Sequence, residues 1–341
     1  MVKIGDTYSS QKCITCGVPQ GTVLGPILFI LYINDLCEKD LNGSIITYAD
    51  DTVLIYRDTC WSNVYKKAND SLKGVYEWLN NNLLTLNKTK TVYLPFSVTS
   101  KTEPNPLLSI KLHTASCMSN QCDCYVLKSC NYTKYLGITI DKNLRWTPHI
   151  SDTVKKARNL MYVFYRLRHF LPTNMLLTVY KTLAQLILQY GIIGWGGVSL
   201  SKMNPLITTQ KYILKVLLNK KMNFSSNLTY ELTNVLDIKQ IYIKSIILHV
   251  FKNKNLYKIV ELPNNNISIT RSKFKKHLLC VPRKHKAIAQ AHVDFLGPKV
   301  FNQIPRDLII CNQLKQFKHY IHTWILKLGR DLSYDLLHVA N

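Results

Sequence analysis

Residues 45–56 decide the fold, and they read Ile-Ile-Thr-Tyr-Ala-Asp-Asp-Thr-Val-Leu-Ile-Tyr. Two runs rich in β-branched and aromatic residues, 45–48 and 53–56, flank the four residues Ala49–Thr52, so the stretch predicts a β-hairpin. The expected turn holds Asp50 and Asp51, adjacent carboxylates that repel each other. A hard divalent cation stabilises such a pair by binding its oxygens. For this pair alone, an ordinary aspartate-containing turn is the alternative interpretation.

A Gly/Pro-rich loop and an apolar segment precede the hairpin. Residues 17–26 read Gly-Val-Pro-Gln-Gly-Thr-Val-Leu-Gly-Pro, and residues 24–41 are almost continuously apolar. Glycine lets the backbone approach a ligand closely, and the N-terminus of a helix favours a phosphate. We expect residues 24–41 to form a buried helix that begins next to a ligand-binding loop.

The remainder of the first half alternates between strand and helix patterns. We expect a helix over residues 65–82, a strand that ends at Leu94, and a second hairpin. In that hairpin, Tyr135–Ile140 and Leu144–Trp146 would flank a turn at Asp141–Asn143. Residues 97–131 are polar, contain cysteines and carry no assignable pattern.

From residue 150 onward the apolar residues recur with the period of a helix. One helix face contains Val154, Ala157, Met161, Phe164 and Leu167. A second helix is predicted to begin at Pro172-Thr173 and to end before Gly191–Gly197, with a face formed by Leu176, Val179, Tyr180, Leu183, Ile187 and Tyr190. Further helices are expected over about residues 203–219 and 238–253, before a basic segment at 271–286.

Charge is distributed unevenly along the chain, whose net charge is +24. Residues 1–150 hold 15 Lys/Arg against 12 Asp/Glu, whereas residues 151–341 hold 29 against 8. The second half therefore favours a polyanionic partner, and nucleic acid is the first candidate. A solvated helical surface is the alternative, and a membrane partner is disfavoured because no clean amphipathic face accompanies the charge. With no signal-peptide pattern at the N-terminus, we expect a nuclear or cytoplasmic protein that is not secreted.

The order of these motifs resembles the reverse transcriptases of non-LTR (LINE-type) retrotransposons, in particular the jockey-like lineage. The resemblance rests on the loop at 17–26, the Tyr48–Asp51 turn, the Asn-Lys-Thr-Lys-Thr run at 87–91 and the segment 135–150. Less specific matches to the family follow at Tyr190-Gly191, Trp195-Gly196, Thr270-Arg271 and 301–305.

The resemblance implies an α+β fold: an incomplete right-hand polymerase palm, then a helical thumb and a helical C-terminal region. The implied domains are a partial palm with the primer-grip hairpin at 1–148, a thumb-like region at 149–225 and a basic helical region at 226–341. The implied function is RNA-directed DNA polymerase, with an RNA template, a DNA primer and dNTPs as partners. The oligomeric state stays open.

The resemblance also implies roles for individual residues. Asp50 and Asp51 would bind Mg²⁺ or Mn²⁺ and act in catalysis. Lys90 would protonate the departing diphosphate, with a solvated surface lysine as the alternative. Contacts to nucleotide and template are implied for Pro19, Gln20, Gly21, Tyr48 and Ala49, and the primer grip for Tyr135, Leu136 and Gly137.

The family has a strand with the first catalytic aspartate before the Gly17 loop, and only sixteen residues precede that loop here. We therefore expect a site that is incomplete within this chain, little activity of the chain alone, and an apolar helix 24–41 that exposes surface. A non-catalytic nucleic-acid-binding remnant and a translated pseudogene are the alternative hypotheses.

Four cysteines of the unassigned segment raise the question of a zinc site: Cys117, Cys122, Cys124 and Cys130. Their spacing lacks the paired Cys-x-x-Cys elements of common zinc folds. Reduced cysteines in a variable insertion are the favoured interpretation, and zinc is the alternative. His149 is predicted to be a packing or capping histidine.

Overall fold

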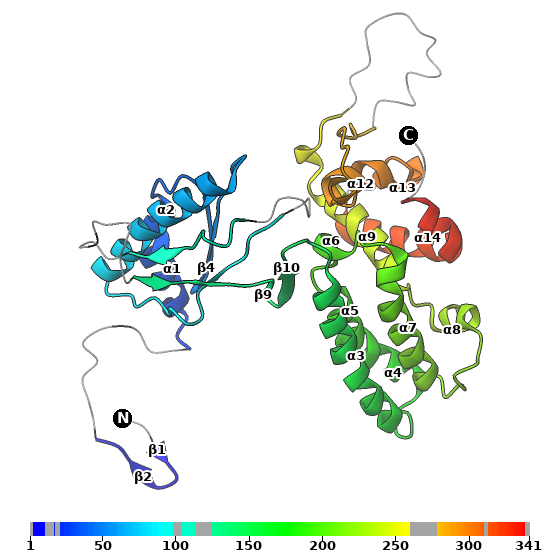
Figure 1. The fold of residues 1–341 in the computed structure, drawn as a ribbon. Coiled ribbons are helices and arrows are strands. Elements are labelled where there is room, and N and C mark those ends of the chain that lie inside the picture. The colour runs from blue at the N-terminus through cyan, green and yellow to red at the C-terminus, as the bar shows by residue number, and fades with distance from the viewer. Residues whose placement is uncertain are drawn as a thin grey trace, which may run out of the picture. The chain divides into compact units, whose positions relative to one another are not determined.

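The computed structural model describes residues 3–10, 17, 21–97, 104–113, 117, 124–259, 278–309 and 313–337. The chain forms two compact units, Met1–Asn131 and Tyr132–Asn341, each described by itself (Figure 1). The first mixes helices with short strands and the second is mainly helical, which confirms the expected mixture of helices and strands. The domain limits at 148 and 225 rest on family resemblance and stay a prediction.

Eight short strands and two helices make up the described part of the first unit. Within the first unit the elements are β1 (Lys3–Ile4), β2 (Thr7–Tyr8), α1 (Leu24–Cys37), β3 (Ser44–Tyr48), β4 (Asp51–Ile55), α2 (Trp61–Asn81), β5 (Val92–Tyr93), β6 (Lys111–Leu112), β7 (Tyr125–Val126) and β8 (Lys128–Ser129). In the described residues each sheet has two strands: β1–β2, β3–β4, β5–β8, β6–β7 and, in the second unit, β9–β10.

The first hairpin is confirmed, but its turn is shorter than expected. Tyr48 pairs with Asp51, so the loop contains only Ala49 and Asp50, and the predicted four-residue turn Ala49–Thr52 is wrong. Two-residue hairpin loops need a positive φ at their first residue, and Ala49 supplies it with φ 51°. Asp51 and Thr52 therefore belong to β4.

Helix α1 forms as predicted, but it ends at Cys37 and is not buried. Only Ile33 and Leu36 are buried, whereas Leu24, Ile30 and Leu31 are at least 60% exposed. Ile33 and Leu36 pack with Leu41 and with Val75 and Trp78 of α2, and this cluster also contacts Ile45 and Leu54 of the hairpin. The expectation of a buried helix was wrong because this small core contacts only one side of α1. The expectation of an exposed apolar face is confirmed.

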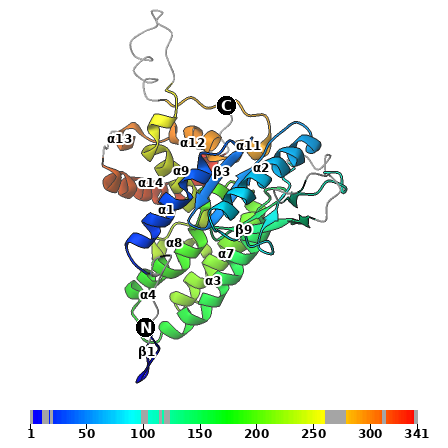
Figure 2. The ribbon, with the colours of Figure 1, turned by 90° about the vertical axis from the view of Figure 1, so that its left-hand side faces the viewer.

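The second unit is a bundle of helices preceded by one hairpin. Its elements are β9 (Tyr132–Tyr135), β10 (Ile138–Asp141), α3 (Thr147–Leu167), α4 (Thr173–Val179), the π-helix η1 (Tyr180–Ala184), α5 (Gln185–Gln189), α6 (Ile192–Trp195), α7 (Leu200–Leu217), α8 (Ser226–Thr233), α9 (Ile238–Lys252), the 3₁₀-helix η2 (Lys254–Leu256), α11 (Ala287–Gln290), α12 (Val293–Phe301), α13 (Arg306–Ile309) and α14 (Leu314–Asp335). Helices α3 and α7 lie side by side (Figure 2). The expected helices over 203–219 and 238–253 correspond to α7 and α9.

A single π-helical turn changes which residues of the predicted 172–190 helix are buried. The sequence predicted Leu183 and Ile187 on the core face, but the buried residues are Ala184 and Leu188. A π-turn adds one residue to a helical turn, so every later position of the core face shifts by one. The prediction is correct up to the first residue of the turn, since Leu176 and Tyr180 are buried, and wrong beyond it.

The second hairpin also differs from its predicted pairing. Tyr135 pairs with Ile138, which places the turn at Leu136-Gly137 rather than at residues 141–143. Both turn residues have positive φ, 44° and 83°, as a two-residue loop of the I′ kind requires. Asp141 instead stabilises the backbone just before α3, because its carboxylate accepts hydrogen bonds from the backbone N–H groups of Arg145 (3.0 Å) and Trp146 (2.7 Å).

A buried polar network fixes the helices of the second unit, and sequence periodicity gives no indication of it. Asp237 is fully buried; its carboxylate caps α9 through the backbone N–H of Gln240 and accepts a hydrogen bond from the hydroxyl of Tyr334 on α14. Gln210 of α7 donates to the hydroxyl of Tyr180 at 2.8 Å and to the carbonyl of Leu236 at 2.9 Å. Burial raises the pKa of Asp237.

Candidate metal and nucleic-acid sites

The β3–β4 hairpin presents its two aspartates to solvent. Ile45 and Leu54 are paired across the strands, and both contact the small core. Successive residues of a strand point to opposite faces, so Tyr48 and Asp51, each an odd number of positions away, face outward. Asp50 occupies the second loop position. Both carboxylates are exposed, and neither takes part in an ion pair within 4.0 Å among the described residues.

Two adjacent carboxylates suit a hard, oxygen-binding cation. Mg²⁺ is usually held by one or two carboxylates together with water and substrate phosphates. Asp50 and Asp51 fit that donor set. In the part of the chain that the structure describes, no third His, Cys, Asp or Glu ligand joins them within 4.8 Å. Two carboxylates make up only part of such a donor set, so a metal ion bound here would need further ligands.

The predicted nucleotide-binding loop is only partly visible. Pro19 and Gln20 lie outside the described residues. Gly21 has φ 84° and Gly17 has φ 80°, a conformation that favours glycine. Helix α1 follows directly, and the hydroxyl oxygen of Thr22 accepts a hydrogen bond from the backbone N–H of Gly25 at 3.2 Å. The roles of these loop residues stay a prediction.

Lys90 lies in a compact turn at the end of the Asn87–Thr91 run. The side-chain oxygen of Asn87 accepts a hydrogen bond from the backbone N–H of Lys90 at 3.1 Å, and the carbonyl of Asn87 accepts one from the N–H of Thr91 at 3.0 Å. The asparagine thus shapes the turn that presents the lysine, and Lys90 itself is exposed. It makes no ion pair within 4.0 Å with Asp50 or Asp51, all three being described residues.

Two motifs that are far apart in the sequence meet at the second hairpin. The hydroxyl of Tyr190 donates to the carbonyl of Leu136 at 2.8 Å, and a Cβ atom on Gly137 would lie 3.2 Å from the Tyr190 ring, a tight contact. Trp195 donates from its indole N–H to the carbonyl of Tyr190 at 2.8 Å. His149 packs edge-on against Trp195 with ring centroids 5.3 Å apart, which confirms it as a packing histidine.

The second unit contains a cluster of basic side chains that the sequence pattern did not predict. It consists of Lys181 of η1, Lys244 of α9, and Lys318, His319 and His322 of α14, called the basic cluster below. Burial and the charges of Lys318 and Lys181 lower the pKa of Lys244 to about 8. Burial and the neighbouring Lys244, Lys181 and His319 lower the pKa of His322 to about 4. Among the described residues, no carboxylate acts on these two groups, so Lys181, Lys244 and Lys318 form an electropositive group suited to an anion.

Comparison with known proteins assigns part of the chain to a family. Residues 2–140 match the family model of reverse transcriptase (RNA-dependent DNA polymerase). These residues belong to a reverse transcriptase domain. The match covers α1, the β3–β4 hairpin and the second hairpin up to β10, so the resemblance inferred from the motifs is confirmed.

Three relatives of this reverse transcriptase domain come from mobile elements of Drosophila melanogaster. The chain is 26% identical to the probable RNA-directed DNA polymerase from transposon BS, over 83% of the chain and 29% of the relative. It is 27% identical to the enzyme of transposon X-element, over 57% and 21%, and 26% identical to that of mobile element jockey, over 63% and 23%. These matches support a reverse transcriptase domain of the non-LTR, LINE type within this chain.

The chain spans less than a third of the length of these relatives. No solved structure matches it at a significant level. Among the described helices, none is long and apolar enough to cross a membrane.

Proposed function

We propose that the chain contributes Asp50 and Asp51 to the metal site of an RNA-directed DNA polymerase that extends a DNA primer with dNTPs on an RNA template. The observation that carries the proposal is the pair of exposed carboxylates at the hairpin end inside the matched reverse transcriptase region. Bound Mg²⁺ or Mn²⁺ would lower the pKa of the primer 3′ hydroxyl and stabilise the leaving diphosphate.

The other residues take supporting roles in this proposal. Tyr48 and Ala49 shape the end of the hairpin, because Ala49 supplies the positive φ of the two-residue loop that contains Asp50. Pro19, Gln20 and Gly21 contact the nucleotide and template, and Lys90 donates a proton to the diphosphate. Tyr135, Leu136 and Gly137 hold the primer, with the Leu136-Gly137 turn fixed by Tyr190.

Two carboxylates do not bridge two ions as well as three do, so we expect slow primer extension by this chain alone. The test uses the chain, an RNA template, a labelled DNA primer and either Mg²⁺ or Mn²⁺. Asp50→Asn should abolish any extension and weaken the binding of Mn²⁺, measured by electron paramagnetic resonance. Asp70→Asn is the matched control, because Asp70 is an exposed aspartate of α2 in the same unit. Mn²⁺ binding and extension that both survive Asp50→Asn would refute the assignment.

A second candidate function is nucleic-acid binding without catalysis, and the basic cluster favours it. Phosphates that replace the missing counter-charge would relieve the repulsion among Lys181, Lys244 and Lys318. The logarithm of the binding constant should fall linearly with the logarithm of the salt concentration. The double variant Lys181→Gln/Lys318→Gln should reduce that slope by about 1–2, whereas Lys39→Gln in the first unit should leave it unchanged. Binding that does not depend on salt would contradict this function.

Nuclear or cytoplasmic residence is part of the same proposal.

A further inference from the structure

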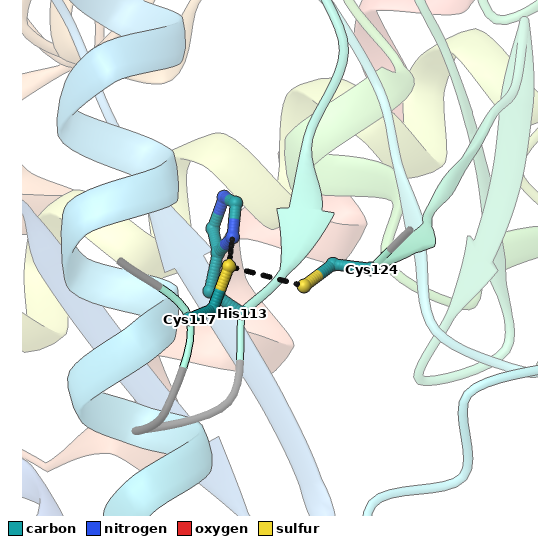
Figure 3. A group of neighbouring side chains, drawn as sticks. All are labelled: His113, Cys117 and Cys124. Atoms are coloured by element: carbon teal, nitrogen blue, oxygen red, sulfur yellow. Dashed lines mark hydrogen bonds between the residues drawn. The ribbon is translucent and has the colours of Figure 1, made fainter. Parts of the chain in front are cut away.

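Three potential metal ligands converge next to the β6–β7 hairpin. Lys111 pairs with Val126 and Leu112 with Tyr125, so the next residues along the two chains, His113 and Cys124, lie opposite each other. Cys117 comes from the chain between them. Figure 3 shows the imidazole of His113 and the two thiols turned toward one another, and their ligand atoms lie within 4.8 Å of one another.

The distances between these atoms agree with the edges of a tetrahedral zinc site. Cys117 Sγ is 3.5 Å from His113 Nδ1 and 3.5 Å from Cys124 Sγ. With Zn–S bonds of about 2.3 Å and Zn–N bonds of about 2.0–2.1 Å, tetrahedral geometry separates N from S by about 3.6 Å and S from S by about 3.8 Å. The three side chains therefore need only small shifts to bind one ion.

The backbone that carries these ligands is anchored to α2. The side-chain oxygen of Asn69 accepts a hydrogen bond from the N–H of Lys111 at 2.8 Å, and its amide donates to the carbonyl of Ser109 at 3.1 Å. Leu112 and Leu127 are buried against Leu72 of the same helix. The hairpin thus holds His113 and Cys124 in place, which lowers the entropic cost of assembling a site.

The chemistry of the donors selects the metal. One imidazole and two thiolates suit zinc, whereas Mg²⁺ prefers oxygen ligands such as Asp50 and Asp51. All three ligand residues are partly buried, which shields them from competing water without closing the site. Among the described residues, no other three His, Cys, Asp or Glu ligands lie this close together.

We propose that His113, Cys117 and Cys124 bind one Zn²⁺ ion, with a water molecule as the fourth ligand, and that the ion joins Cys117 to the ends of β6 and β7. Binding forms one Zn–N and two Zn–S bonds and releases the two thiol protons to solvent. The cysteine spacing did not predict this site, since His113 completes it. Cys122 lies outside the described residues, and Cys130 is not in the group because its thiol donates to the carbonyl of Tyr93 at 3.3 Å.

The test uses the whole chain, purified under reducing conditions, stripped with a chelator and titrated with Zn²⁺ or Co²⁺. Wild-type chain should bind one equivalent. The Co²⁺ form should show the sulfur-to-metal charge-transfer band and the visible absorption of a tetrahedral site with two sulfur ligands. Because this spectrum is measured on the wild type, it remains decisive even if a variant fails to fold.

Cys117→Ser, Cys124→Ser and His113→Ala should each weaken Zn²⁺ binding by more than about 100-fold, since loss even of a group that only supports a ligand costs about 10–100-fold. Cys130→Ser is the matched control from the same unit and should bind as the wild type does. Asp50→Asn should also keep the zinc, which separates this proposal from the polymerase proposal. Failure of the wild type to bind one equivalent, or full binding by the double variant Cys117→Ser/Cys124→Ser, would overturn the inference.

Discussion

The hydroxyl of Tyr190 donates a hydrogen bond to the carbonyl oxygen of Leu136, although 54 positions separate the two residues. This contact joins the end of the second helical segment to the turn of the second hairpin. Both residues belong to motifs whose order along the chain matches the family. The sequence alone did not show that these motifs contact each other.

Tyr190→Phe should reduce the free energy of unfolding by about 0.5–1.5 kcal/mol, since it removes one hydrogen bond and keeps the ring. Urea denaturation of the chain measures the change. Tyr162→Phe is the control, because Tyr162 of α3 is 69% exposed. Equal effects of the two substitutions would mean that the Tyr190–Leu136 contact does not stabilise the fold.

Ala49→Gly should raise the free energy of unfolding by about 0.5–1 kcal/mol. Ala49 adopts φ 51°, a conformation that costs an L-residue about 1–2 kcal/mol, and glycine removes most of that cost. The same exchange in a helix, Ala68→Gly in α2, should instead destabilise by about 1 kcal/mol. Thermal and urea unfolding compare the two, and destabilisation by Ala49→Gly would contradict the described turn.

Asp237→Ala should destabilise the second unit by about 2–3 kcal/mol, because α9 loses its N-cap and the partly buried hydroxyl of Tyr334 loses its acceptor. Asp237→Asn keeps an oxygen at both positions and should cost less. Chemical denaturation followed by helical circular dichroism provides the measurement. A loss no larger for alanine than for asparagine would exclude the capping role.

Lys244 should make stability depend on pH at the alkaline end. Its folded pKa of about 8 lies below the unfolded value of about 10.4, so the unfolded chain binds more protons between these pH values. The contribution of Lys244 to the free energy of unfolding therefore rises with pH across that window. Lys244→Met should flatten the dependence, and Lys252→Met, which removes a charge from the same helix, is the control. An unchanged pH profile in Lys244→Met would disprove the described environment of the amine.

The sequence predicted the parts of the fold that depend on local periodicity. The first hairpin and the helices α2, α3, α7 and α9 follow from alternation or from apolar residues at helical spacing. The two turn positions were misplaced because positive φ at Ala49 and Leu136 overrides the usual preference of these residue types. The burial of α1 was predicted wrongly because an apolar composition does not show how many other side chains are available to cover the helix.

The same distinction between local and long-range contacts decides which parts of the candidate sites the sequence could predict. Asp50 and Asp51 are adjacent in the chain, so their proximity was predictable. His113 and Cys124 are brought together by strand pairing, and the lysines of the basic cluster by helix packing. A spacing rule that considered cysteines alone could not include His113, and a charge count could not place Lys181 beside Lys244.

The π-helical turn at Tyr180–Ala184 has a consequence for how this chain tolerates genetic change. A copy that loses one codon there, such as that of the exposed Thr182, would keep Leu176, Tyr180, Ala184 and Leu188 on the same side of an uninterrupted α-helix. A one-codon deletion elsewhere in α4 or α5 lacks this surplus residue and would rotate the following side chains away from the core. The turn is thus a place where the length of the coding sequence can vary while the packed face stays the same.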